Sequence, residues 1–296
     1  MAGAESTLWR TMVDTIQGAM FRYTKSVNDI KLFEWDAHDI WYQYIQLAKN
    51  IDAEHPAQDR LVRVVLWTRE LGVLSRTKKR SQLWPVTEWD NHKIVVQEAV
   101  TEDGRLWIDL PYLVRDVCSA WADVMNSTTS PPHHYNLASA IARLAGLGIR
   151  DNALSGCGLA VMREGLEVPR AIYHESSPTG PALEESARSM TTMSIMDFHP
   201  MLMSWMVYAG HKLLHLSHTS YDAASWDTAQ THLGELAISA GVGSAGFSRA
   251  RFGFWVNRME ELKQNDKKEV KEAFQKCYFL ASRILHELDD HGLEEV

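Results

Sequence analysis

The chain has 296 residues, of which 45% are hydrophobic and 23% charged, which is ordinary for a globular protein. Its formal net charge of −8 argues against a nucleic-acid-binding protein, because phosphate contacts require a basic excess or a basic stripe. No apolar run reaches the ~18 residues that a membrane-spanning helix needs, so we expect a cytoplasmic protein with no membrane partner.

Apolar residues recur at helical spacing from the first third of the chain onwards. We expect one helix to begin near Trp35, with Asp36 as its cap, and a second to run from Pro56 to Leu74. The pattern changes between residues 94 and 108, where short apolar runs flank Asp103 and Gly104. This segment predicts either one short hairpin or an irregular loop.

Helical spacing then resumes and continues to the end of the chain. Further helices are predicted over 111–124, 136–146, 153–166, 248–262 and 267–290. Residues 169–181 read as a loop, and a helix is expected from Pro181, with Glu184 and Glu185 in its first turn. Pro200 is expected to start the next helix. Without an internal repeat or a clear linker, we predict one all-α, bundle-like domain of about ten helices over residues 1–296.

Three cysteines, Cys118, Cys157 and Cys277, lie far apart in the sequence. There is no Cys-x-x-Cys pair, so neither a disulfide framework nor a cysteine-based zinc site is indicated. We expect these residues to be buried free thiols.

Several short motifs resemble one fungal family. They are Leu106-Trp-Ile-Asp-Leu-Pro111, Asn136-Leu-Ala138 with Ala142-Arg-Leu144, Ala209-Gly-His-Lys-Leu-Leu214, and Gly246-Phe-Ser248 with Arg251-Phe-Gly-Phe-Trp255 and Arg258. Together they resemble the uncharacterised domain-of-unknown-function family 3632. The resemblance implies an all-α fold and a filamentous-fungal origin, and it favours small-molecule chemistry of specialised metabolism. It implies no catalytic residues.

The segment 198–218 is the best candidate for a functional site. On a helical wheel one face carries titratable and hydroxyl groups, and the opposite face is apolar. The polar face consists of Ser204, Tyr208, His211, His215 and His218, with Lys212 at its edge. Solvent-facing helix surfaces usually carry Glu, Lys and Arg, and this face has no carboxylate.

These residue types suit proton transfer without a cofactor. Histidine titrates near neutrality, so His211 or His215 is predicted as the general acid or base. Tyr208 and Lys212 are predicted to stabilise negative charge that develops on the substrate. The predicted substrate-binding residues are Trp205, Ser204, Met201 and Trp255.

A metal site is a weaker alternative. His211 and His215 have the i, i+4 spacing that can chelate a divalent ion, but the glutamate of an HExxH motif is missing. A third ligand would have to come from His133, His134 or Asp222. No phosphate-binding glycine motif occurs either, so we expect neither a metal nor a nucleotide cofactor.

The leading hypothesis is therefore a cofactor-independent isomerase or cyclase of fungal specialised metabolism. Its partner would be a small aromatic or polyketide-like ligand, and the sequence leaves a homo-oligomer open. Two alternatives remain: a non-catalytic helical interaction or scaffold protein, and a metal-dependent enzyme. The enzymatic hypothesis requires that the histidine face borders an enclosed cavity of several hundred Å³.

Overall fold

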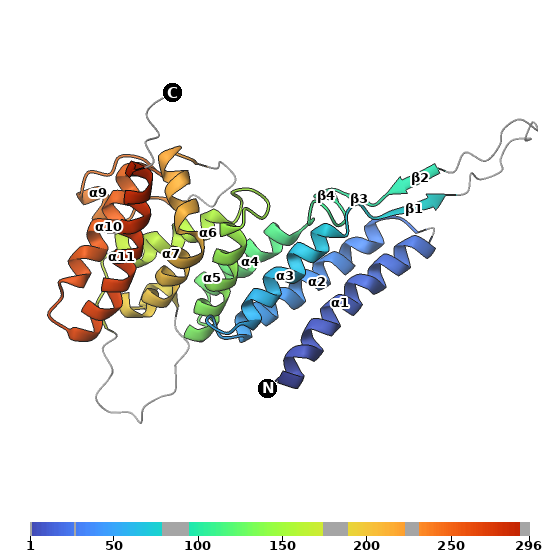
Figure 1. Ribbon diagram of the computed structural model, residues 1–296, viewed down its shortest axis with the longest axis horizontal. Coiled ribbons are helices and arrows are strands. Elements are labelled where there is room, and N and C mark those ends of the chain that lie inside the picture. The colour runs from blue at the N-terminus through green and yellow to red at the C-terminus, as the bar shows by residue number, and fades with distance from the viewer. Residues whose placement is uncertain (1, 27, 79–94, 174–188, 223–230, 291–296) are drawn as a thin grey trace, which may run out of the picture. The chain divides into compact units, whose positions relative to one another are not determined.

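The computed structural model, drawn in Figure 1, comprises two compact units. The described residues are 2–26, 28–78, 95–173, 189–222 and 231–290. Unit 1 comprises residues 1–48 and 56–117, and unit 2 comprises residues 49–55 and 118–296. The single domain expected over residues 1–296 stays a prediction.

The all-α class is confirmed. Ten α-helices occur in the described residues, together with two sheets of two short strands each. The helix expected from Pro181 lies outside the described residues. Within the part of the chain that is described, no helix is both long and apolar enough to cross a membrane.

Unit 1 is built on three long helices, α1 (Ala2–Lys25), α2 (Lys31–Asn50) and α3 (Ala57–Glu70). The last residues of α2 belong to unit 2. The inner face of α2 buries Trp41, whose indole N–H donates a 2.7 Å hydrogen bond to the carbonyl of Pro111. Since α2 begins at Lys31, Asp36 does not cap it. The Asp36 carboxylate instead lies 2.5 Å from the guanidinium of Arg22 in α1.

The strands of unit 1 follow α3, which ends before Leu74. Strand β1 (Ser75–Lys78) pairs antiparallel with β2 (Val95–Glu98), with Ser75 opposite Glu98. Strands β3 (Val100–Thr101) and β4 (Gly104–Arg105) form a tight hairpin. The hairpin predicted near 94–108 is therefore present over residues 100–105. Residues 95–98 pair with an earlier segment, a long-range partner that local turn signals do not reveal.

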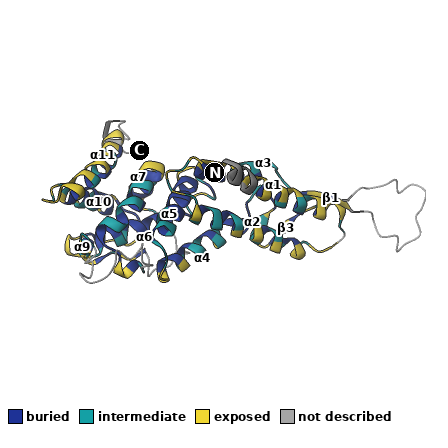
Figure 2. Cartoon of the chain, turned by 90° about the horizontal axis from the view of Figure 1, so that it is seen from below, coloured by how far each residue is buried: buried dark blue, intermediate teal, exposed yellow. Residues whose placement is uncertain are grey.

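Unit 2 is organised around α7 (Ile195–His218), which packs against α5 (Pro131–Gly146), α6 (Ser155–Met162), α10 (Arg249–Lys263) and α11 (Lys268–Asp290). Helix α4 (Leu113–Asn126) begins in unit 1 and ends in unit 2, and α9 (Glu235–Ser239) is short. Helix α5 is buried over most of its length (Figure 2).

Small residues allow the helices of unit 2 to approach closely. A Cβ atom at Gly146 of α5 would lie 1.9 Å from the carbonyl oxygen of Tyr208 in α7. One at Gly210 of α7 would lie 2.4 Å from Ile284 of α11. Close backbone approach of this kind requires glycine, so these two positions set the spacing of three helices.

Helix α7 starts earlier than the sequence suggests. Ser194 caps it, accepting a hydrogen bond from the Asp197 N–H while the Asp197 carboxylate accepts from the Ser194 N–H. Pro200 lies inside the helix, one turn after its start. The prediction that Pro200 begins the helix was wrong, because the capping box satisfies the first amide groups upstream of it.

Candidate functional site

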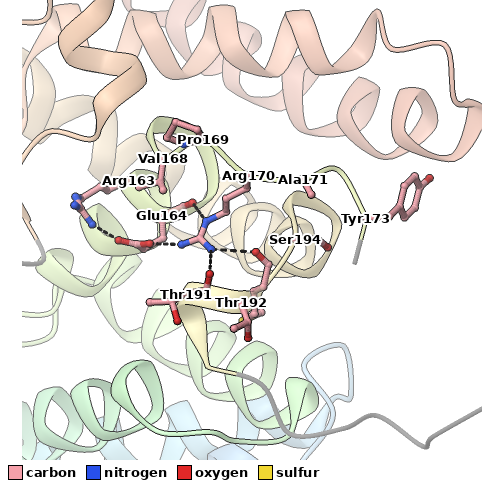
Figure 3. Close-up of a pocket in the computed structure, with 11 residues that line it drawn as sticks. Arg163, Glu164, Val168, Pro169, Arg170, Ala171, Tyr173, Thr191, Thr192 and Ser194 are labelled. Carbon is pink, nitrogen blue, oxygen red and sulfur yellow. Dashed lines mark hydrogen bonds and ion pairs between the residues drawn. The ribbon is translucent and has the colours of Figure 1, made fainter. Parts of the chain in front are cut away.

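A pocket of about 640 Å³ lies in unit 2 between residues 163–173 and 191–194 (Figure 3). Its first wall is the π-helical turn Arg163–Glu167, which continues directly from α6. Its second wall is the 3-10 turn Met190–Thr192 and the start of α7. The volume is within the usual range for a small-molecule site. None of the eight predicted site residues is among the described residues that line it.

Arg170 holds the two walls of this pocket together. Its guanidinium lies against the carboxylate of Glu164, and it also donates to the carbonyls of Met190 (2.7 Å) and Met193 (3.0 Å). The side chain is 5% exposed, and burial lowers the pKa of Arg170 while the Glu164 carboxylate opposes that shift. With so many of its donors engaged, Arg170 is an anchor of the pocket and not its recognition group.

Arg163 has donors left over. Its Nη1 pairs with the carboxylate of Glu164, but its Nε is buried and has no hydrogen-bond partner among the described residues. The Arg163 side chain is 22% exposed and lines the pocket, so a ligand can reach its outer guanidinium N–H groups but not the enclosed Nε. Arg163 is therefore the group in this pocket best suited to bind a carbonyl or carboxylate oxygen.

The polar face of α7 lies elsewhere and is exposed. The side chain of His211 is 70% exposed, with its Nε2 3.6 Å from the Glu287 carboxylate of α11. His215 is also exposed, and Lys212 is half-buried. His218 pairs with Arg249. The structure thus places the three histidines along a solvent-facing surface.

The Tyr208 side chain contacts Arg143 and links two helices. Arg143 of α5 donates a 2.6 Å hydrogen bond to the phenol oxygen, and its guanidinium carbon lies 3.8 Å from the ring centroid. The same arginine also donates to the carbonyl of Ala53. This pairing links α5 to α7 through a cation–π contact as well as a hydrogen bond.

The predicted substrate-binding residues lie mainly in the core. Trp205, Met201 and Trp255 are fully buried, and Ser204 is half-buried. The ring of Trp205 packs so tightly against Gly158 that a Cβ atom there would lie 2.6 Å from it. In the structure these residues contribute packing within unit 2.

A buried ion pair was not anticipated from the sequence. Both oxygens of Glu167 face Arg251, with Nε 2.6 Å from Oε1 and Nη2 3.0 Å from Oε2. The Trp255 indole N–H donates to Oε1 (2.7 Å), and the Gly234 N–H donates to Oε2 (2.8 Å). Arg251 also donates to three backbone carbonyls between residues 231 and 246. Arg251 and Trp255 stand out in the sequence, but Glu167 lies 84 positions away and carries no local signal.

The structure gives no support for the alternative metal site. Over the described ranges, no group of three or more His, Cys, Asp or Glu side chains lies close enough together to hold a metal ion. His134, one of the suggested third ligands, is buried, with its ring nitrogens 3.1 Å from the carbonyl of Val124 and 3.2 Å from that of Ser130.

Residues 41–259 match the family described as "Protein of unknown function (DUF3632)". The chain belongs to this family. The match covers the π-helical turn, the pocket and the Glu167–Arg251 pair, so all three lie within the DUF3632 region.

Among curated proteins, the DUF3632 chain is similar to "Oxopyrrolidines biosynthesis cluster protein G" of Penicillium oxalicum. The two are 28% identical over 267 residues, which is 88% of this chain and 66% of the relative. The chain therefore spans just under two thirds of that protein. No solved structure matches the chain significantly.

Proposed function

We propose that this protein acts in fungal specialised metabolism by binding a small organic molecule in the pocket formed by residues 163–173 and 191–194. Support for the setting comes from the similarity to a protein named for an oxopyrrolidine biosynthesis cluster. Support for the binding comes from the pocket volume of about 640 Å³. We infer a cytoplasmic location from the sequence.

The observation that carries this proposal is the partly exposed guanidinium of Arg163 in the pocket wall, whose side chain is 22% exposed. It favours a ligand with a carboxylate, an enolisable carbonyl or a lactam oxygen, all of which accept hydrogen bonds. Val168, Met193 and Tyr173 also line the pocket and supply apolar contact area for the rest of the ligand.

The isomerase or cyclase reaction is a finer proposal, with His211 or His215 as general base or acid. Exposed imidazoles act in water, where charge developing on a substrate is stabilised far less than in a closed site. The exposure of His211 therefore makes binding in the 163–194 pocket the function that we favour.

The binding proposal is tested by isothermal titration calorimetry with a panel of 3-acyl-2-pyrrolidinones and their carboxylated analogues. The variant Arg163→Gln removes the charged donor, and we expect a loss of affinity of about 10- to 100-fold, the equivalent of a hydrogen bond to a charged group. Arg283→Gln is the matched control, because Arg283 lies exposed on α11.

A second variant blocks the pocket without touching its charges. Ala171 lines the pocket with an exposed side chain, so Ala171→Trp should fill part of the volume and abolish binding. Circular dichroism checks that both variants keep the helical fold. Unchanged affinity in Arg163→Gln and Ala171→Trp would show that the ligand binds elsewhere, and the α7 histidines would then be tested by His211→Ala and His215→Ala.

The second candidate function is that of an interaction protein, favoured by an exposed apolar face on α2. Leu32 is 59% exposed, Trp35 72% and Tyr42 62%, and they lie within one stripe of the helix. The partner that we propose is a second copy of this chain. Lys31 and Asp39 are both exposed and lie one turn on either side of Trp35. An antiparallel copy crossing at Trp35 would therefore place each Lys31 opposite the other copy's Asp39.

Charge exchange tests this dimer directly by sedimentation velocity. Lys31→Asp and Asp39→Lys should each weaken association, because each places like charges opposite one another. The double variant should restore association, because the acidic side chain at position 31 then faces the basic side chain at position 39 of the other copy. Phe21→Ser, which removes an exposed aromatic residue from α1, is the control. A chain that is monomeric at all concentrations, or a double variant no better than the singles, would rule out this interface.

A further inference from the structure

Two cysteines that are distant in the sequence meet in unit 2. The Sγ atoms of Cys118 in α4 and Cys157 in α6 lie 4.0 Å apart, although 39 positions separate the residues. Cys118 is half-buried and Cys157 is buried. The pair therefore joins a partly exposed cysteine to a buried one.

The environment makes the two thiols unequal. A hydrogen bond from Cys157 lowers the pKa of Cys118, even though burial opposes the shift. The same contact and complete burial raise the pKa of Cys157. The thiolate is the reactive form of cysteine, so Cys118 is the better nucleophile and Cys157 the better second thiol.

We propose that Cys118 and Cys157 form a peroxide-reactive site, in which Cys118 is oxidised first and Cys157 resolves it to a disulfide. The Cys118 thiolate attacks one oxygen of a hydroperoxide, the O–O bond breaks, and a sulfenic acid forms as hydroxide or alkoxide leaves. The Cys157 sulfur then attacks the Cys118 sulfur. The S–O bond breaks, the S–S bond forms, and the thiol proton leaves with the hydroxyl group as water. The peroxide takes up the two electrons that the two thiols lose.

The geometry permits this second step. A disulfide bond is about 2.05 Å long, so the two sulfur atoms must approach one another by about 2 Å. Movement of this size is within reach of side-chain rotation. The third cysteine provides an internal comparison, because Cys277 is fully buried and burial raises its pKa to about 12.

The experiment uses the full-length protein, reduced and then freed of reductant, with hydrogen peroxide as the probe. Intact mass should fall by two hydrogens, and the count of free thiols should fall from three to one. Non-reducing tryptic mapping should show peptides 116–143 and 151–163 joined. Three alkylatable thiols after treatment, a stable sulfenic acid on Cys118, or a disulfide between two chains would each overturn the proposal.

Variants separate the roles of the two thiols. Cys157→Ala should leave Cys118 as a sulfenic acid that dimedone traps, whereas Cys118→Ala should abolish both dimedone labelling and the mass loss. Cys277→Ala is the matched control and should form the disulfide at the wild-type rate. Should a variant fail to fold, the wild-type peptide map decides the question alone. Equal dimedone labelling in wild type and Cys157→Ala would contradict a resolving role for Cys157.

Discussion

Glu167 and Arg251 face each other through two hydrogen bonds, of 2.6 Å and 3.0 Å, with both side chains fully buried. A buried ion pair is tolerated only when both partners are hydrogen-bonded throughout, because each ion has lost its hydration. Here Trp255 and Gly234 donate further hydrogen bonds to the Glu167 carboxylate, and backbone carbonyls accept the remaining hydrogen bonds of the Arg251 guanidinium. The pair therefore joins the π-helical turn to α10 and to the loop before it.

Removing one partner should be costly. Arg251→Met leaves the Glu167 carboxylate buried without its countercharge, so the free energy of unfolding should fall by about 3–5 kcal/mol. Urea denaturation followed by circular dichroism measures this change. Arg258→Met is the control, since Arg258 forms a more exposed ion pair with Glu261 and should lose only about 0–1 kcal/mol. Similar losses in the two variants would contradict an anchoring role for Arg251.

Two glycines in helices should respond to alanine in opposite directions. At Gly158, an added methyl group would lie 2.6 Å from the ring of Trp205, and overpacking should destabilise the fold by about 1–3 kcal/mol. At Gly253, an added methyl group would meet no heavy atom within 4 Å beyond the adjoining backbone of its own helix, so the better helix propensity of alanine should stabilise the fold by about 0.5–1 kcal/mol. Thermal unfolding distinguishes the two. A rise in Tm for Gly158→Ala would mean that Trp205 moves aside freely.

Stability should decrease as the solution is acidified below neutral pH. Burial lowers the pKa of His134 and of His199 from the ordinary value of 6.5. Between that value and the lower folded-state pKa, the unfolded chain binds more protons than the folded chain. The stability contributed by the neutral histidines is thus present above pH 6.5 and is lost as pH falls towards their folded-state pKa values.

A substitution of His199 measures how much this residue contributes to the pH dependence of stability. Its Nε2 lies 3.1 Å from the carbonyl of Ala273, and glutamine can supply an N–H at that position without titrating. His199→Gln should therefore flatten the fall of Tm between pH 7 and pH 5, whereas His286→Gln on the exposed side of α11 should leave it unchanged. An unaltered slope in His199→Gln would show that this imidazole does not drive the acid sensitivity.

Helical periodicity was enough to predict the all-α class, and several helix starts, such as those near residues 56, 248 and 267, were predicted to within about one residue. Ser248 caps α10 as its position before an apolar pattern suggests, and its hydroxyl accepts from the Arg251 N–H at 3.1 Å. The helix start predicted at Pro200 was wrong, because proline is also tolerated within the first turns of a helix that an upstream serine has capped. The pairing of β1 with β2 joins segments that are separated in the sequence, so local turn signals could not predict it.

The candidate site was harder to predict, because periodicity identifies the faces of a helix but not what covers them. Trp205 was predicted to bind substrate, and its full burial against Gly158 depends on a helix about 50 positions away. No local sequence motif singles out Arg163 or Arg170. Only the fold shows that Arg170 uses its donors in hydrogen bonds within the protein, whereas Arg163 keeps an unpaired Nε.

The π-helical turn Arg163–Glu167 limits which sequence changes this protein can accept during evolution. Glu164 lines the pocket and Glu167 lies in the core, only three positions later. Deleting one residue from the turn would rotate one of these carboxylates out of its environment. New ligand preferences should therefore arise through substitutions in 168–173 and 191–194, where side chains can vary while the helix register stays intact.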